Sequence, residues 1–178
     1  MNYIIFCSCY HSWYQKCIRL HALSLLGILD YKYLNTIKCA LSEEEAEAYK
    51  QNLPNCPMVT PTQFMLDCSR DRDTPFNQSA ITVFAEDFLD KVENHFWYSS
   101  AKIPQRYRNV DTIEAAFKAH FSYIKTRYRE VVVAPSKDPI QAKQAINLKL
   151  QRSSRGSRKA RVCTQWFHIS IILLAFSC

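Results

Sequence analysis

The stretch that decides the fold is DTIEAAFKAHFSYIKTRYR, residues 111–129. Its apolar and aromatic side chains recur every three or four positions, which is the spacing of one helix face: Ile113, Phe117, His120, Ile124 and Tyr128. Asp111 is followed three residues later by Glu114, which makes a capping box with Asp in place of Ser or Thr. The sequence therefore predicts a helix with Asp111 as its N-cap.

Two stretches earlier in the chain have the same helical spacing. Residues 79–96 predict a helix whose apolar face is Ile81, Phe84, Phe88, Val92 and Phe96. Its polar positions include Glu86, Asp87, Asp90 and Glu93. Residues 13–29 predict a second helix, with Ser12 as a cap and with a face made of Tyr14, Ile18, His21, Leu25 and Ile28.

Two shorter helices are indicated by their starts. Ser42 and Glu45 form a capping box, which predicts a short exposed helix that ends by Leu53. Asp138, followed by Pro139 and Gln141, predicts a helix that continues to about Leu150. The run Val131–Val133 between the predicted helices is too short to predict a strand.

Glycine is scarce, with 2 among 178 residues, where average usage of roughly 7% would give about a dozen. This scarcity argues against folds that need tight glycine turns, and it excludes the Walker loop, the dinucleotide fingerprint and the nucleophile elbow. We expect an all-α fold, a small irregular helical domain with a basic flexible segment and an apolar C-terminal tail. We expect no enzyme activity and no cofactor.

Proline placement predicts the domain organisation. Pro54, Pro57, Pro61 and Pro75 mark residues 54–76 as a linker, which separates a loosely helical region, 1–53, from a helical domain, 77–151. The run QRSSRGSRKAR begins at Gln151, and residues 152–161 within it are predicted to form a basic flexible segment. Residues 162–178 are predicted to form an apolar tail.

Charge is unevenly distributed along the chain. The formal net charge is +7, yet residues 1–100 carry 8 Lys and Arg against 12 Asp and Glu, and residues 101–161 carry 15 against 4. This asymmetry favours an anionic partner: nucleic acid, an acidic membrane surface or an acidic protein. A charged face that only keeps the protein soluble is the alternative.

The basic residues of the second half predict a binding surface. Lys118, Lys125 and Arg129 fall within an arc of roughly 40° on the predicted helix, away from its apolar face, and Tyr107, Tyr123 and Tyr128 add rings suited to stacking. The expected nucleic-acid-binding residues are Arg106, Arg108, Lys118, Lys125, Arg127, Arg129, Arg152, Arg155, Arg158, Lys159 and Arg161.

Three functions remain open at this point. The first is an intracellular, nuclear module that binds nucleic acid without strong sequence specificity. The second is an interaction or structural module with an acidic protein partner, which the same basic residues support. The third is a tail-anchored membrane protein, because Val162–Cys178 is an uncharged stretch behind a basic run. At 17 residues it lies at the lower limit for spanning a bilayer, and we expect it not to insert.

Metal and acid–base sites have weaker signals. Cys7, Cys9, His11, Cys17 and His21 are ligand types that zinc prefers, but their spacing equally indicates core residues of a helix. Asp67, Asp71 and Asp73 could hold a hard cation, but the interleaved Arg70 and Arg72 favour a solvated, self-neutralised linker. His95 and His120 have no recognisable nucleophile or carboxylate partner, so we expect core or boundary histidines. The cysteines, in a chain without a secretory signal, are expected to be mostly reduced and buried.

One run of residues resembles a known pattern: Trp97-Tyr98, Ile103-Pro104, Tyr107, Asn109-Val110, Phe117, His120, Tyr123 and Arg127-Tyr128-Arg129. It is similar to a pattern in uncharacterised helical proteins of mushroom-forming fungi and covers about residues 75–161. The resemblance implies a helical, non-enzymatic module and no particular activity. Met1–Lys50 and Cys163–Cys178 depart from it, and we expect them to be gene-prediction extensions such as translated introns.

Overall fold

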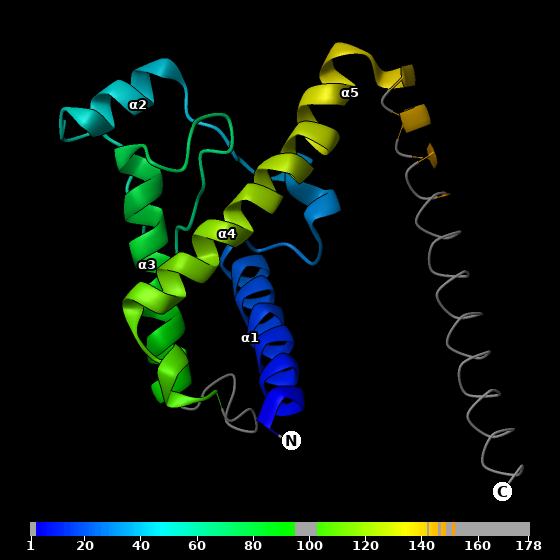
Figure 1. Ribbon diagram of the computed structural model, residues 1–178. Helices are drawn as coiled ribbons and strands as arrows, with labels where there is room; N and C mark the ends of the chain where they lie inside the picture. The colour runs from blue at the N-terminus through cyan, green and yellow to red at the C-terminus, as the bar shows by residue number, and fades with distance from the viewer. Residues whose placement is uncertain (1–2, 95–102, 142, 146, 149–150, 152–178) are drawn as a thin grey trace, which may run out of the picture. The chain divides into compact units, whose positions relative to one another are not determined.

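The computed structural model describes residues 3–94, 103–141, 143–145, 147–148 and 151, with side chains from Ser12 onward. These parts of the chain are predominantly helical and contain no β-strand, so the predicted all-α fold is confirmed. The elements are α1 (Tyr3–Leu25), η1 (Tyr31–Thr36), α2 (Glu43–Lys50), α3 (Pro75–Glu93), η2 (Gln105–Tyr107), α4 (Val110–Tyr128), η3 (Arg129–Val133) and α5 (Ala134–Lys137) (Figure 1). The chain divides into two compact units, Met1–Val132 and Val133–Cys178.

The first unit is built on the contacts that α1, α3 and α4 make with one another (Figure 1). The rings of Phe84 on α3 and Phe117 on α4 stack, with 3.7 Å between their centroids and an interplanar angle of 5°. Tyr14 of α1 stacks on Tyr107 of η2 at 4.5 Å. Most of the predicted face residues of α3 and α4 are buried: Ile81, Phe84, Phe88, Val92, Ile113, Phe117 and Ile124. His120 and Tyr128 are only partly buried, and Phe96 lies outside the described residues. Phe121, which the α4 prediction did not include, is fully buried.

The long helices begin earlier than predicted. Asn109, not Asp111, caps α4: its side-chain oxygen accepts a hydrogen bond from the backbone N–H of Thr112 at 2.8 Å, and Asp111 lies in the first turn. α3 begins at Pro75, where proline needs no backbone donor in the first turn. α1 begins at Tyr3, so that Ser12 lies inside this helix and is not its cap.

Glycine ends α1, four residues before the predicted end. Gly27 has a φ of +66°, the left-handed conformation that glycine adopts without a steric penalty. The N–H of Gly27 donates to the carbonyl of Ser24, and the N–H of Ile28 donates to that of Leu23, both at 3.0 Å. This pair of bonds is a Schellman motif, which satisfies the last carbonyls of the helix.

The predicted starts of the two shorter helices are confirmed. Ser42 and Glu45 form the predicted capping box of α2, which has no buried residue and ends at Lys50. In the second unit, Oδ1 of Asp138 accepts from the backbone N–H groups of Ile140 and Gln141, and the described residues between 139 and 151 are helical. Val131–Val133 belong to the π-helical turn η3.

The segment predicted as a linker contributes to the core. Residues 54–74 form no regular helix, but Phe64, Leu66 and Cys68 are buried with residues of α1, α3 and α4 in one cluster. Tyr14, Ile18 and other residues from the segment expected to be an N-terminal extension belong to the same cluster. Residues on both sides of the prolines therefore share one core, and the boundary between the units lies at Val132.

Candidate anion-binding groove

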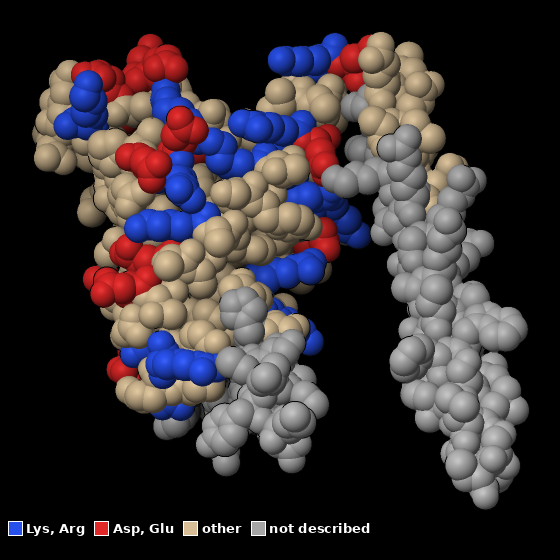
Figure 2. All heavy atoms as spheres, in the orientation of Figure 1, with Lys and Arg blue, Asp and Glu red and all other residues tan. Residues whose placement is uncertain are grey.

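Three of the predicted nucleic-acid-binding residues on α4, two of them on its predicted basic face, pair with acidic side chains within the fold. Nζ of Lys118 lies 3.0 Å from Oε2 of Glu114, one turn before it. Nζ of Lys125 lies 3.1 Å from Oδ1 of Asp71. Arg127 pairs with Glu130. On the face of the molecule in Figure 2, basic and acidic side chains are accordingly interspersed, and acidic ones gather over α2. These three cations are therefore less available to a partner than the sequence suggested.

The remaining predicted residues have varied surroundings. The Arg106 guanidinium lies over the Tyr107 ring, 4.9 Å from its centroid, and Nε of Arg108 donates to the Ile103 carbonyl at 2.8 Å. Arg129 is exposed just after α4. Five predicted residues lie outside the described part of the chain: Arg152, Arg155, Arg158, Lys159 and Arg161.

A groove of about 570 Å³ lies between α1 and α4. Its side chains come from four α1 residues, Ser12, Gln15, Lys16 and Arg19, and from three α4 residues, Ala119, His120 and Tyr123. No acidic residue is among these described lining residues. Asp30 lies nearby, with its Oδ2 3.7 Å from the Arg19 guanidinium, and both side chains of this pair are about half exposed.

The cations of this groove come from the polar side of α1. Lys16 and Arg19 are one turn apart and are the only charged residues of α1, whereas Tyr14, Ile18 and His21 are buried on its other side. Lys16 and Arg19 were not among the site residues predicted from the sequence. The signal was present, because two cations without any acidic residue in a 23-residue helix are unusual for a surface that only keeps a protein soluble.

Two rings, His120 and Tyr123, line the α4 side of the groove, and the ring of Tyr31 packs against both. Oη of Tyr31, a buried residue of η1, lies 2.7 Å from Nε2 of His120 in a hydrogen bond. His120 stacks with Tyr123 at 5.6 Å, and Tyr31 meets Tyr123 edge to face at 5.7 Å. Burial, together with the nearby Arg19, lowers the pKa of His120 to about 4. His120 is therefore a neutral boundary histidine at pH 7, and its role here is to position a ring.

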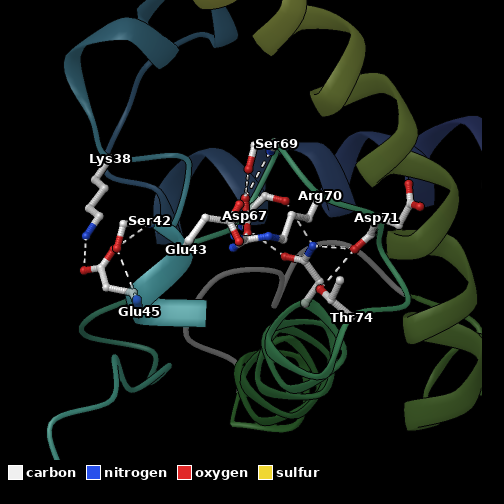
Figure 3. Close-up of polar contacts among 10 residues, drawn as sticks. Lys38, Ser42, Glu43, Glu45, Asp67, Ser69, Arg70, Asp71 and Thr74 are labelled. Atoms are coloured by element: carbon white, nitrogen blue, oxygen red, sulfur yellow. Dashed lines mark hydrogen bonds and ion pairs between the residues drawn. The ribbon is translucent and has the colours of Figure 1, made fainter. Parts of the chain in front are cut away.

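The predicted acidic cluster at Asp67, Asp71 and Asp73 contains an ion pair with an arginine, Arg70. Asp67 is 1% exposed; its Oδ1 accepts from the backbone N–H of Ser69 at 3.1 Å, and its Oδ2 lies 3.0 Å from Nη1 of Arg70. Arg70 also reaches Glu43 at 2.8 Å (Figure 3). Self-neutralisation is thus as predicted, but Asp67 is buried rather than solvated.

The other predicted ligands and acid–base groups give no assembled site. Cys17 and His21 are buried, and the side chains of Cys7, Cys9 and His11 lie outside the described set, as does His95. Burial raises the pKa of the Cys17 thiol to about 12 and that of Cys39 to about 11, so neither is a thiolate at pH 7. Among the described residues, no three His, Cys, Asp or Glu side chains are grouped as metal ligands would be.

No family model, curated protein or solved structure matches the chain. In the described residues, no helix combines the length and the apolar character needed to cross a membrane.

Proposed function

We propose that the chain is a non-enzymatic module that binds nucleic acid without strong sequence specificity, in the groove between α1 and α4. The observation that carries the proposal is the pairing of Lys16 and Arg19 on one wall with exposed Tyr123 on the other, with no acidic residue among the described lining. Cations that meet phosphates and rings that meet bases are the two components of non-specific recognition.

Arg19 is available to a phosphate despite its neighbour. Its separation from Asp30 is 3.7 Å, and both side chains are about half exposed. An exposed pair of this kind contributes about 0–1 kcal/mol. A phosphate, which accepts two hydrogen bonds from one guanidinium, competes well for such a residue.

On the strength of the sequence, we propose that Arg129 and the cations from Arg152 to Arg161 also contact phosphates. Each Lys or Arg that neutralises a phosphate releases counterions and steepens the salt dependence of binding. A basic run of this kind also serves nuclear import, and we propose a nuclear location on that ground.

Removal of the groove cations tests the proposal. Fluorescence anisotropy of labelled oligonucleotides with the full chain measures affinity as a function of salt concentration. We expect Lys16→Ala/Arg19→Ala to weaken binding to every sequence and to reduce the salt slope by roughly two units, about one for each lost phosphate contact.

The matched control is Lys38→Ala/Lys50→Ala, which removes the same charge from residues that flank or end α2. Lys38 pairs with Glu45 and Lys50 with Glu47, and neither lysine lines the groove. An equal loss of affinity in both double variants would show that only net charge matters, and the proposed binding site in the groove would be wrong. Absence of binding at low salt to any oligonucleotide would contradict the function itself.

A further inference from the structure

We infer that the groove selects single strands over duplexes, because one unpaired base stacks on Tyr123 while Lys16 and Arg19 hold the neighbouring phosphates. The inference rests on the proposed function and adds the class of nucleic acid to it.

Tyr123 is accessible and yet held in place. It is 46% exposed, although two other rings contact it, His120 in a stacked arrangement at 26° and Tyr31 at 74°. Most exposed tyrosines lose rotamer freedom when a ligand covers them. Here the neighbouring rings already restrict Tyr123, so less of that entropy remains to be lost on binding.

The supporting rings are themselves fixed. Tyr31 is 1% exposed, and its hydroxyl contacts Nε2 of His120 at 2.7 Å. The Arg19 guanidinium lies 5.9 Å from the centroid of the same Tyr31 ring. Tyr31 thus contacts both His120 and Tyr123, and it also lies beside Arg19. The stacking ring and the phosphate-binding cation therefore share one buried neighbour.

The arrangement suits an unpaired base. In a duplex, the faces of each base are covered by the neighbouring bases, so a ring on the protein surface finds only the edges and the backbone. In a single strand the faces are free, and every base presents one. Stacking of this kind does not read sequence. The other polar residues of the groove are Ser12, Gln15 and His120, and Nε2 of His120 already contacts the Tyr31 hydroxyl.

The experiment compares four ligands of one length with the full chain by fluorescence anisotropy: a single strand of mixed sequence, its duplex, oligo-dT, and a strand of abasic sites with the same phosphates. We expect the single strands to bind more tightly than the duplex and the abasic strand. We expect Tyr123→Ala to weaken single-strand binding by about 5- to 150-fold, the range for one stacked base, and to leave duplex and abasic binding unchanged.

Two variants separate stacking from structure. Tyr123→Phe keeps the ring and should bind single strands within about twofold of the parent chain. Tyr33→Ala removes a tyrosine of η1 that is 41% exposed and does not line the groove, and it should change nothing. Thermal melting of each variant confirms that the fold is retained.

The outcomes separate this inference from the function on which it rests. Equal or tighter binding of the duplex, or an unchanged affinity of Tyr123→Ala for single strands, overturns the single-strand inference and leaves non-specific binding intact. If no ligand binds at low salt, the proposed function fails, and the inference fails with it.

Discussion

Asp87 is buried between a histidine and a lysine. Its Oδ2 lies 3.1 Å from Nε2 of His21, and its Oδ1 lies 3.0 Å from Nζ of Lys91. The rings of Phe84 and Phe88 meet His21 edge to face at 4.9 and 5.3 Å. Burial lowers the pKa of His21 more than Asp87 raises it. The imidazole is therefore neutral at pH 7, and Lys91 is the cation that pairs with this carboxylate.

Removal of the Asp87 carboxylate should destabilise the protein more than the substitution of a polar surface residue usually does. We expect Asp87→Ala to lower the free energy of unfolding by about 2 kcal/mol or more, because the half-buried ammonium of Lys91 loses its acceptor and the buried imidazole loses its nearest polar neighbour. Urea denaturation at pH 7 measures it. Glu86→Ala, at the exposed neighbouring position, is the matched control and should stay within about 0.5 kcal/mol of the parent chain. Similar losses in the two variants would contradict a structural role for the trio.

At the scale of elements, α2 differs from the other α-helices of the first unit, α1, α3 and α4, because none of its residues is buried. It is attached by a few contacts at its two ends. Glu43 pairs with Arg70 (Figure 3), and the ring of Tyr49 meets that of Phe76 on α3 edge to face at 5.1 Å. A helix with so little buried apolar surface depends on its caps and can open without the rest of the fold.

The capping box of α2 should therefore control local opening. Ser42→Ala removes an acceptor for the backbone N–H of Glu45, at a cost of about 1 kcal/mol, which corresponds to roughly fivefold faster amide exchange across Glu43–Lys50. The melting temperature of the whole protein should hardly change. Ser42→Thr keeps the hydroxyl and serves as the control in the same hydrogen-exchange measurement. A clear drop in melting temperature for Ser42→Ala would mean that α2 unfolds together with the core.

Helix positions were predictable from sequence wherever local chemistry had one solution. Ser42 and Asp138 each had one capping pattern, and both start a helix as expected. For α4 the predicted cap was Asp111, but the structure caps the helix with Asn109, two residues earlier, a difference that periodicity cannot decide. The end of α1 depends on the left-handed conformation of Gly27. The apolar pattern continues through Ile28, so it predicted a helix that extends past this glycine.

At the scale of the whole molecule, what sequence could not supply is the pairing of distant residues. Glu114 and Lys118 are one turn apart on one helix, so their ion pair could be predicted from the sequence. Asp71 and Lys125 are 54 residues apart and meet only because the 67–74 loop packs on α4. The groove follows the same rule: Tyr123 was identified as a stacking ring, but its proximity to Lys16 and Arg19 required the contact between α1 and α4.

Buried His21 and partly buried His120 make the stability of the whole protein depend on pH. Burial lowers the pKa of His21 and lowers that of His120 to about 4, from 6.5. Between those values the unfolded chain binds more protons than the folded one, so stability rises with pH in this window. The contribution is complete above about pH 6.5 and is lost as the pH falls toward 4. For His120 it amounts to at most about 3 kcal/mol.

We therefore expect the free energy of unfolding, measured by urea denaturation, to fall steadily between pH 7 and pH 5, where most carboxyl groups of the unfolded chain are still ionised. His120→Gln can still meet the Tyr31 hydroxyl but has no proton to gain, so its stability should fall less steeply over the same interval. The comparison uses the slope with pH and not the absolute stability, which separates titration from any loss of packing in the variant. Equal slopes in the two proteins would show that His120 is already protonated or freely solvated in the folded state, in which case the ring that holds Tyr123 would not be fixed by burial.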